Sequence, residues 1–135
     1  MRNRFDRELT TLNTELIEMG ALIENAIDRA VGALFKQDEA LAERAIEFDS
    51  EVDRKERDIE ARCLNLLLQQ QPVARDLRTV SSALKMITDM ERIGDQAADI
   101  AEITHRLKLT DAPLYDTHIK DMSKSTIRMV KEAVD

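Results

Sequence analysis

Two carboxylates one helical turn apart, Glu91 and Asp95, stand in the stretch DMERIGDQAADI, which otherwise has the pattern of a helix that packs into a core. Glu91 takes a position where the spacing of the surrounding apolar residues calls for an apolar side chain. Because residues at i and i+4 share one face of a helix, the two carboxylates lie close together. Gly94, Ala98 and Ala101 nearby are small, so they leave room at this face or allow a close approach.

A second group of carboxylates stands earlier in the chain at spacings of four, three and four. It borders the apolar stripe of its own segment rather than opposing it. Its members are Asp49, Asp53, Glu56 and Glu60.

The two groups predict either a metal site or an ordinary charged surface. Like charges at i,i+4 repel, and an unpaired carboxylate near a core is costly. A divalent or trivalent cation would offset that cost, because hard metal ions prefer several carboxylate oxygens. The alternative is a salt-bridged or solvated face, with Arg54, Arg57 and Arg92 as the basic neighbours. Spacing alone leaves both interpretations open.

Three long amphipathic segments have to position these carboxylates, and alternating steps of four and three predict a helix for each. The first has its apolar seam at Phe5, Leu9, Leu12, Leu16, Met19, Ile23, Ala26, Ala30 and Ala33. The second follows Leu41, Ala45, Phe48, Val52, Ile59, Cys63 and Leu66, with Lys55 or Glu56 interrupting it. The third follows Val73, Leu77, Val80, Leu84, Ile87, Glu91, Gly94, Ala98, Ala101 and His105.

Short connections join these segments. Asp38 follows Lys36 and Gln37 and is the expected N-cap of the second helix. Pro72 suits the first turn of the third helix, where its missing N–H does no harm. This third helix should have about 35 residues and be roughly 50 Å long. Connections of a few residues force successive helices to lie antiparallel. We therefore expect an all-α protein in which an up-down-up bundle of three helices occupies residues 1–108.

A fourth amphipathic segment begins near Pro113, after a linker, and is expected to open a second repeat in residues 109–135. At an offset of 103 residues, Met19, Ile27, Ala30 and Val31 align with Met122, Val130, Ala133 and Val134. The pattern is still running at Asp135, so we expect a longer repeat protein. An apolar face on this helix should seek a partner, which predicts a homodimer that packs or exchanges residues 113–135.

The composition excludes several classes of protein. Acidic residues outnumber basic ones by 27 to 20, which argues against a basic nucleic-acid-binding face. The single cysteine, Cys63, excludes an internal disulfide framework, and no apolar run approaches the ~20 residues that span a bilayer. With no signal-peptide pattern at the start, the chain is expected to be cytoplasmic. It carries no glycine-rich phosphate loop and no nucleophile beside a base, so we expect no enzyme activity.

The chain resembles the PhoU family of phosphate-transport regulators. The resemblance lies in FDSEVDRKERDIEARCLNLLLQQQPVARDLR and in SSALKMITDMERIGDQAADIAE. The acid-xxx-Asp motifs of this family appear here as DSEVD and ERIGD, and QPVARDLR is an equally typical join. The resemblance covers residues 1–108, and residues 113–135 look like the start of a second repeat.

The resemblance implies a metal site, partners and a role. Asp49, Asp53, Glu91 and Asp95 become the expected ligands of iron, zinc, manganese or magnesium ions, with Glu56, Glu60 and Asp99 as weaker candidates. The implied protein is cytoplasmic and often dimeric, and it links PstB, the ATPase subunit of the phosphate ABC transporter, to the sensor kinase PhoR. In this role it represses the phosphate-starvation response.

Two other interpretations compete with this one. A carboxylate-bridged metalloenzyme in a helix bundle should carry two Glu-x-x-His pairs, and only Glu102 with His105 has that spacing. A purely structural coiled-coil module would bind no metal at its acidic stripe. Cys63 and the methionines are expected to pack in the core, and His105 and His118 to lie at the surface or near a helix end.

Overall fold

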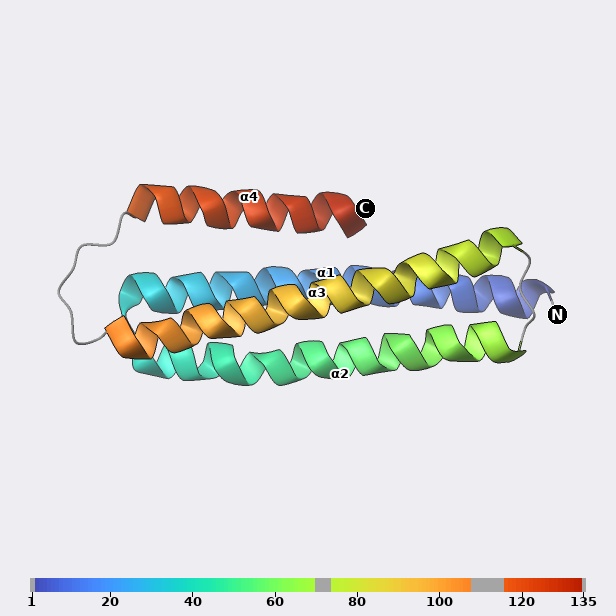
Figure 1. The fold of residues 1–135 in the computed structure, drawn as a ribbon, viewed down its shortest axis with the longest axis horizontal. Coiled ribbons are helices and arrows are strands. Elements are labelled where there is room, and N and C mark those ends of the chain that lie inside the picture. The colour runs from blue at the N-terminus through green and yellow to red at the C-terminus, as the bar shows by residue number, and fades with distance from the viewer. Residues whose placement is uncertain (1, 70–73, 108–115, 135) are drawn as a thin grey trace.

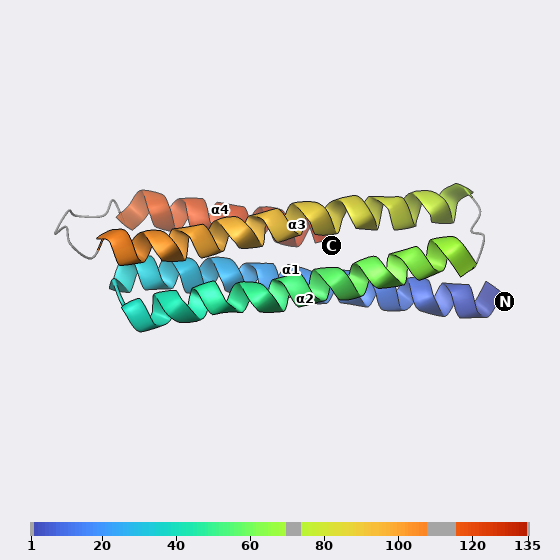
Figure 2. The ribbon, with the colours of Figure 1, turned by 60° about the horizontal axis from the view of Figure 1, so that its bottom comes forward.

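The structure, a computed structural model, describes residues 2–69, 74–107 and 116–134. These residues form four helices, which are α1 (Arg2–Lys36), α2 (Glu39–Gln69), α3 (Ala74–Leu107) and α4 (Asp116–Val134). The first three run up, down and up as an antiparallel bundle, and α4 lies along α1, away from α2 (Figures 1 and 2). The predicted all-α bundle is confirmed. None of the four described helices combines the length and the hydropathy that a membrane crossing requires.

A capped turn between α1 and α2 reverses the chain, as the sequence predicts. Gln37 takes a positive φ of 50°, which ends α1 and allows the Asp38 N–H to donate to the carbonyl of Ala33 at 3.3 Å. The Oδ1 of Asp38 then accepts the N–H groups of Ala40 at 2.9 Å and Leu41 at 3.3 Å. Asp38 is therefore the N-cap of α2.

The core follows the predicted seams with one exception at the start of α3. All nine seam residues of α1 are buried or half-buried. In α3, however, Leu77 is 45% exposed and Asp76 is only 5% exposed, so the prediction for Leu77 was wrong. The first turn of α3 directs Asp76 inward, where a carboxylate is favoured by the positive end of the helix dipole, and the apolar seam begins at Val80. Pro72 and Val73 lie outside the described residues.

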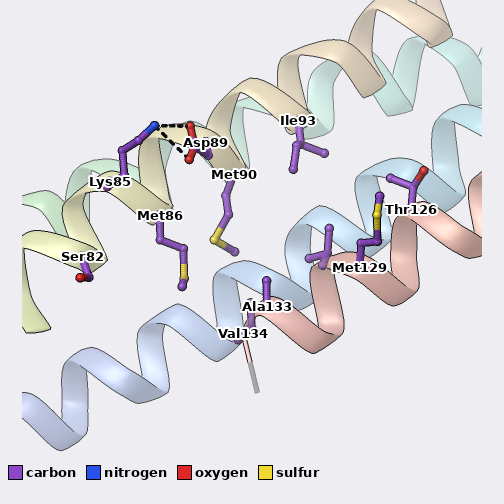
Figure 3. Close-up of a pocket in the computed structure, with 11 residues that line it drawn as sticks. Ser82, Lys85, Met86, Asp89, Met90, Ile93, Thr126, Met129, Ala133 and Val134 are labelled. Atoms are coloured by element: carbon purple, nitrogen blue, oxygen red, sulfur yellow. Dashed lines mark hydrogen bonds and ion pairs between the residues drawn. The ribbon is translucent and has the colours of Figure 1, made fainter.

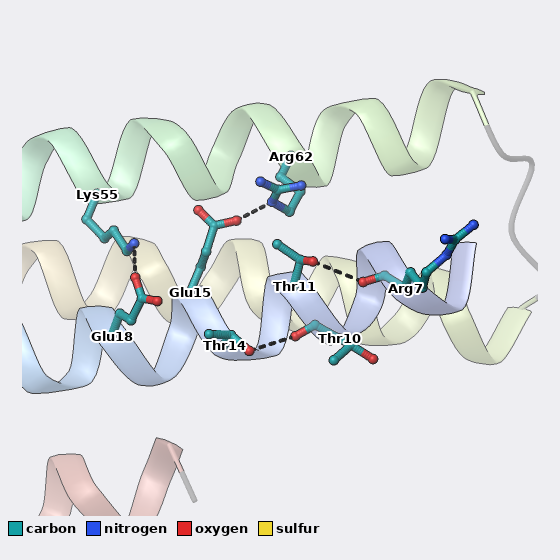
Figure 4. A network of polar contacts seen from close by, with 8 residues as sticks. All are labelled: Arg7, Thr10, Thr11, Thr14, Glu15, Glu18, Lys55 and Arg62. Atoms are coloured by element: carbon teal, nitrogen blue, oxygen red, sulfur yellow. Dashed lines mark hydrogen bonds and ion pairs between the residues drawn. The ribbon is translucent and has the colours of Figure 1, made fainter. Parts of the chain in front are cut away.

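Lys55 and Glu56 interrupt the apolar seam of α2 because they serve two different interfaces. Lys55 is paired with Glu18 of α1, and two turns further along α2 Arg62 is paired with Glu15 of the same helix (Figure 4). Glu56 instead belongs to the acidic cluster shared with α3. Of the two charged residues, Lys55 thus stabilises the contact of α2 with α1, whereas Glu56 adds negative charge to the side that faces α3.

The fourth helix packs on α1 alone among the described helices. Val130 is buried in the contact, and Val134 lies so close to Gly20 that an added Cβ there would come within 3.0 Å of its Cγ2. Lys131 lies 3.8 Å from the Oε1 of Glu24, which is buried and has no hydrogen-bond partner among the described residues. Pro113, the predicted start of this helix, lies outside the described residues.

Candidate metal centre

Helices α2 and α3 bring three of the four predicted ligands together. One carboxylate oxygen from each of Asp49, Asp53 and Asp95 lies within 4.8 Å of the other two. Asp49 and Asp53 are half-buried on α2, one turn apart, and Asp95 faces them from α3 and is exposed. Three carboxylates from two helices therefore converge, although the sequence separates the pairs by about forty residues.

Glu91 lies beside this group and is bound to it through Asp95. A hydrogen bond between the two side chains, followed by burial and the charge of Asp95, raises the pKa of Glu91 to about 7. The charges of Glu56 and Asp53 raise it further. Because two carboxyl groups hydrogen-bond to each other only when they share a proton, this contact favours the protonated form of Glu91.

Asp49 is the most confined member of the cluster. Burial, the charge of Asp53 and a proton-sharing contact with Asp95 raise the pKa of Asp49 to about 6. Its Oδ1 is buried and has no hydrogen-bond partner among the described residues. An ionised, buried oxygen without a donor is costly unless another positive group contacts it.

Gly94 makes the approach of Asp49 possible. A Cβ at this position would lie 3.1 Å from Cγ1 of Val52, 3.3 Å from Oδ1 of Asp49 and 3.4 Å from Cδ1 of Ile23. The sequence shows small residues near Glu91, but it does not show that one of them contacts a carboxylate of another helix. The sequence names Gly94 together with Ala98 and Ala101 as small residues at this face, and the structure identifies Gly94 as one that contacts Asp49 of α2.

Of the weaker candidates, Glu56 is the most closely involved. Burial and the charges of Asp53 and Glu60 raise the pKa of Glu56, whereas Arg57 lowers it. Asp99 acts on Asp49 through its charge, and both Glu60 and Asp99 are exposed. These three enlarge the negative field around the cluster.

Two of the three arginines that could neutralise the cluster pair elsewhere. Arg54 contacts Glu51 at 3.8 Å, and Arg92 contacts Asp89 at 3.8 Å. Arg57 opposes the raised pKa of Glu56 but does not cancel it. Within the described residues, the salt-bridged alternative therefore accounts for little of the charge at this site.

The residues present fit a hard metal ion. The donors are carboxylate oxygens, one of them is buried without a donor, and Gly94 leaves the space that Asp49 uses. Asp49, Asp53 and Asp95 would hold the ion, with Glu91 beside them. A bound cation would lower the pKa of each carboxyl and remove the repulsion between the two helices.

The other candidate residues do not join the cluster. Cys63 is buried, and burial raises the pKa of its thiol to about 11, as expected of a core cysteine. His118 is exposed on α4, and Glu102 is exposed on α3. The side chain of His105 lies outside the described residues, so the structure does not test whether Glu102 and His105 lie close enough to share a metal ion.

Comparison with known proteins places the chain in a family. The model of the PhoU domain matches residues 16–104. A protein of Pseudomonas aeruginosa named phosphate-specific transport system accessory protein PhoU homolog is 34% identical over 98% of this chain and 55% of its own length. A Clostridium acetobutylicum protein of the same name is 37% identical over 99% of this chain and 62% of its own length.

Two solved structures of PhoU proteins also match the fold of this chain. The crystal structure of PhoU from Pseudomonas aeruginosa matches with a TM-score of 0.89 and 34% identity, covering 97% of this chain and 63% of that one. The phosphate transport system regulatory protein PhoU from Streptococcus pneumoniae matches with a TM-score of 0.86 and 31% identity, covering 96% and 61% of the two chains. The chain thus spans between a half and two thirds of these relatives, and it belongs to the PhoU family.

Proposed function

We propose that this chain is a metal-binding regulatory protein of phosphate transport. The observation that carries the metal site is the convergence of Asp49, Asp53 and Asp95 from two helices, with Glu91 hydrogen-bonded to the group. The donor set favours an ion that prefers oxygen, such as iron, manganese or magnesium, and zinc also binds carboxylates. The ion joins α2 to α3 and neutralises the repulsion between them.

The chain acts in this proposal as a helical adaptor and not as an enzyme. It docks on PstB, the ATPase subunit of the phosphate transporter, and on the sensor kinase PhoR, and it represses phosphate uptake and the starvation response when phosphate is plentiful. It works in the cytoplasm and reaches the membrane only through these partners. The names of the relatives, which are accessory proteins of phosphate-specific transport, support this role.

Elemental analysis of the chain purified without a histidine tag tests the metal site. We expect about one or more metal ions per chain in the parent protein and less than a tenth of that amount in a Glu91→Gln, Asp95→Asn double variant. A Glu43→Gln, Glu47→Gln double variant is the matched control, because it neutralises an exposed i,i+4 pair on α2 and should keep the metal.

Two results would contradict this assignment. The parent chain could contain no metal after growth and purification without chelators. Alternatively, the Glu91 and Asp95 variant could retain as much metal as the control. Either result would leave the cluster as a solvated surface and the chain as a structural helical module.

The regulatory role is tested separately in bacteria that lack their own PhoU and carry a reporter of phosphate starvation. We expect the chain to lower reporter activity in phosphate-rich medium, and the Glu91→Gln, Asp95→Asn variant to lower it less at equal protein level. Unchanged reporter activity with the parent chain would contradict the adaptor role of this part of the family fold.

A further inference from the structure

The side of α2 and α3 that carries the acidic cluster changes from charged to apolar along its length. On α3, steps of four and three place on one stripe Leu77, Ser81, Leu84, Thr88, Glu91 and Asp95. On α2, the matching stripe consists of Asp53, Glu56, Glu60, Leu64 and Leu67. Residues three or four apart share one face of a helix, so each stripe joins carboxylates to leucines. We call the surface formed by these two stripes the α2–α3 face.

The leucines of the two stripes lie at the same level of the bundle, as the carboxylates do. Asp53 lies beside Asp95 in the acidic cluster, and the two helices are antiparallel (Figure 1). Leu64 comes eleven residues after Asp53, and Leu84 comes eleven residues before Asp95. These two leucines therefore lie at one level, roughly 16 Å from the cluster, and the apolar half of the face begins there.

The apolar half of the α2–α3 face is exposed. Leu64 and Leu77 are each 45% exposed, and Leu68, one turn beyond Leu64, is 80% exposed. Leu67 and Leu84 are half-buried and pack against the core. A single exposed leucine needs no explanation, but a group of them at one end of a helix pair marks an interaction surface.

Helix α4 does not reach the α2–α3 face. It packs on α1 alone among the described helices and lies away from α2 (Figures 1 and 2). The hollow between α3 and α4 is lined by Met86, Met90 and Met129, and the two methionines of α3 belong to another side of that helix (Figure 3). No residue of the two stripes lines this hollow or the one between α1 and α4. The α2–α3 face is therefore a surface of the three-helix bundle itself.

The other half of the α2–α3 face is negative. Glu60 and Asp99, which extends the α3 stripe by one turn, are exposed and form no ion pair with another described residue. Glu56 is half-buried beside Glu60. These three residues lie outside the group of three aspartates that converge, so they leave negative charge here when an ion is bound.

We propose that the α2–α3 face binds an amphipathic helix of a partner protein that is apolar in one half and basic in the other. Two packed helices accept a third along the line between them, as α1 does on the opposite side of this pair. Apolar side chains at i, i+3, i+4 and i+7 of the ligand helix would cover Leu64, Leu68 and Leu77. Lysines or arginines in its other half would lie beside Glu60 and Asp99.

This inference rests on the proposed adaptor role and names one of its docking surfaces. It does not need the metal, because Glu60 and Asp99 supply the charge and the leucines supply the apolar contact. A chain that binds metal but no helix would fail this proposal alone. A chain that binds the helix but no metal would fail the metal assignment alone.

The test uses two synthetic helical peptides and the whole chain as purified. The α2–α3 face extends over 22 residues from Leu77 to Asp99, roughly 33 Å, so peptides of about 24 residues cover it. Both carry the same leucines in one half, and the other half carries lysine in one peptide and glutamate in the other. In an NMR spectrum of leucine methyl groups, we expect the lysine peptide to shift the signals of Leu64, Leu68 and Leu77. The signals of Leu9 and Leu16, on α1, should stay in place.

Apolar variants test the leucine half of the face. We expect a Leu68→Ser, Leu77→Ser double variant to weaken binding of the lysine peptide at least tenfold. Both side chains are exposed, so the bundle should remain folded. The matched control is an Ile17→Ser, Ile103→Ser variant, which removes side chains that are 49% and 42% exposed elsewhere and should bind normally.

Charge variants test the acidic half. We expect a Glu60→Lys, Asp99→Lys double variant to weaken binding of the lysine peptide at least tenfold and to strengthen binding of the glutamate peptide. The matched control is a Glu43→Lys, Glu47→Lys variant, which makes the same change at exposed positions of α2 outside the face. Mapping with the unmodified chain needs no variant, so it decides the matter even where a variant folds poorly.

Four outcomes would overturn the proposal. The lysine peptide could fail to bind at millimolar concentration, or the glutamate peptide could bind equally well. The shifts could centre on Leu9 and Leu16, which would place the peptide on another side of the bundle. Finally, a dimer that forms without peptide and that the Leu68→Ser, Leu77→Ser variant abolishes would make a second copy of the chain the occupant.

Discussion

At the scale of single residues, the acidic cluster is a local conflict that a cation would resolve. Asp49 and Glu91 both occupy positions where burial and neighbouring carboxylates disfavour their charged forms. Such positions destabilise a metal-free bundle at neutral pH. They become favourable contacts when a positive ion joins them.

The metal-free chain should therefore become more stable as the pH falls from 8 to 5. The pKa of Asp49 rises from 3.8 to about 6 on folding, and that of Glu91 rises from 4.5 to about 7. Across that window the folded chain binds more protons than the unfolded chain, so the free energy of unfolding increases as the pH drops through the folded pKa values. Urea denaturation at several pH values measures this dependence.

An Asp49→Asn variant is the direct check on the cause. It should be more stable than the parent at pH 8 without metal, and the difference should shrink towards pH 5. Asp28→Asn, at an exposed position of α1, should leave the pH dependence of the parent intact. If the stability of the parent instead rose with pH from 5 to 8, the assigned pKa directions would be wrong.

Gly94 and Gly32 should respond in opposite ways to the same change. Gly32→Ala adds a Cβ with no neighbour within 4 Å, so it should raise the free energy of unfolding by roughly 0.5–1 kcal/mol through helix propensity. Gly94→Ala presses on Val52 and Asp49, so it should lose most of this gain and weaken metal binding. Thermal denaturation and metal titration of both variants measure the two effects. Equal stabilisation with unchanged metal affinity would show that Gly94 does not shape the site.

At the scale of elements, helix seams were predictable because they depend on local spacing. The seam of α1 and the Asp38 cap follow from residues within a few positions of one another. The pairing of DSEVD with ERIGD also could be expected once α2 and α3 were antiparallel. The burial of Asp76 could not be predicted in this way, because it depends on how the first turn of α3 packs against the other helices.

The position of α4 was likewise beyond the sequence pattern, because its contacts come from distant residues. Gly20 meets Val134, Glu24 meets Lys131, and Lys120 lies 5.4 Å from the ring centre of Phe35. Each contact joins residues about one hundred positions apart. Periodicity predicts a helix there, but it does not identify the helix on which it packs.

Gly20→Leu should release α4 while the three-helix bundle remains folded. The added side chain would occupy the space of Val134, and leucine is a good helix former, so α1 should stay helical. We expect amide hydrogen exchange in residues 118–134 to increase at least tenfold, with little change in α2. Asn25→Leu, at an exposed position of α1, serves as the control. Unchanged protection of α4 would show that this contact does not hold it.

At the scale of the whole molecule, α3 carries two different surfaces. Glu91 and Asp95 lie beside the carboxylates of α2, whereas Arg75, Arg78 and Lys85 line hollows on the side of α3 that is turned toward α1 and α4. A chain of net charge −7 thus separates a negative site from a positive edge on two sides of one helix.

The chain should form dimers in solution at tens of micromolar. We expect this because α4 packs on α1 alone among the described helices and its Met122 is exposed, so that a second copy could pack against α4 or exchange it. Sedimentation velocity measures the mass, and a single-chain mass throughout this concentration range would contradict the prediction.

The most direct test of the metal assignment is an anomalous difference map from crystals of the metal-loaded chain, measured at the absorption edge of the ion found by elemental analysis. We expect a peak at roughly 2.0–2.6 Å from carboxylate oxygens of Asp49, Asp53 and Asp95. A peak bound only by other residues, or no peak in a chain that carries stoichiometric metal in solution, would contradict it.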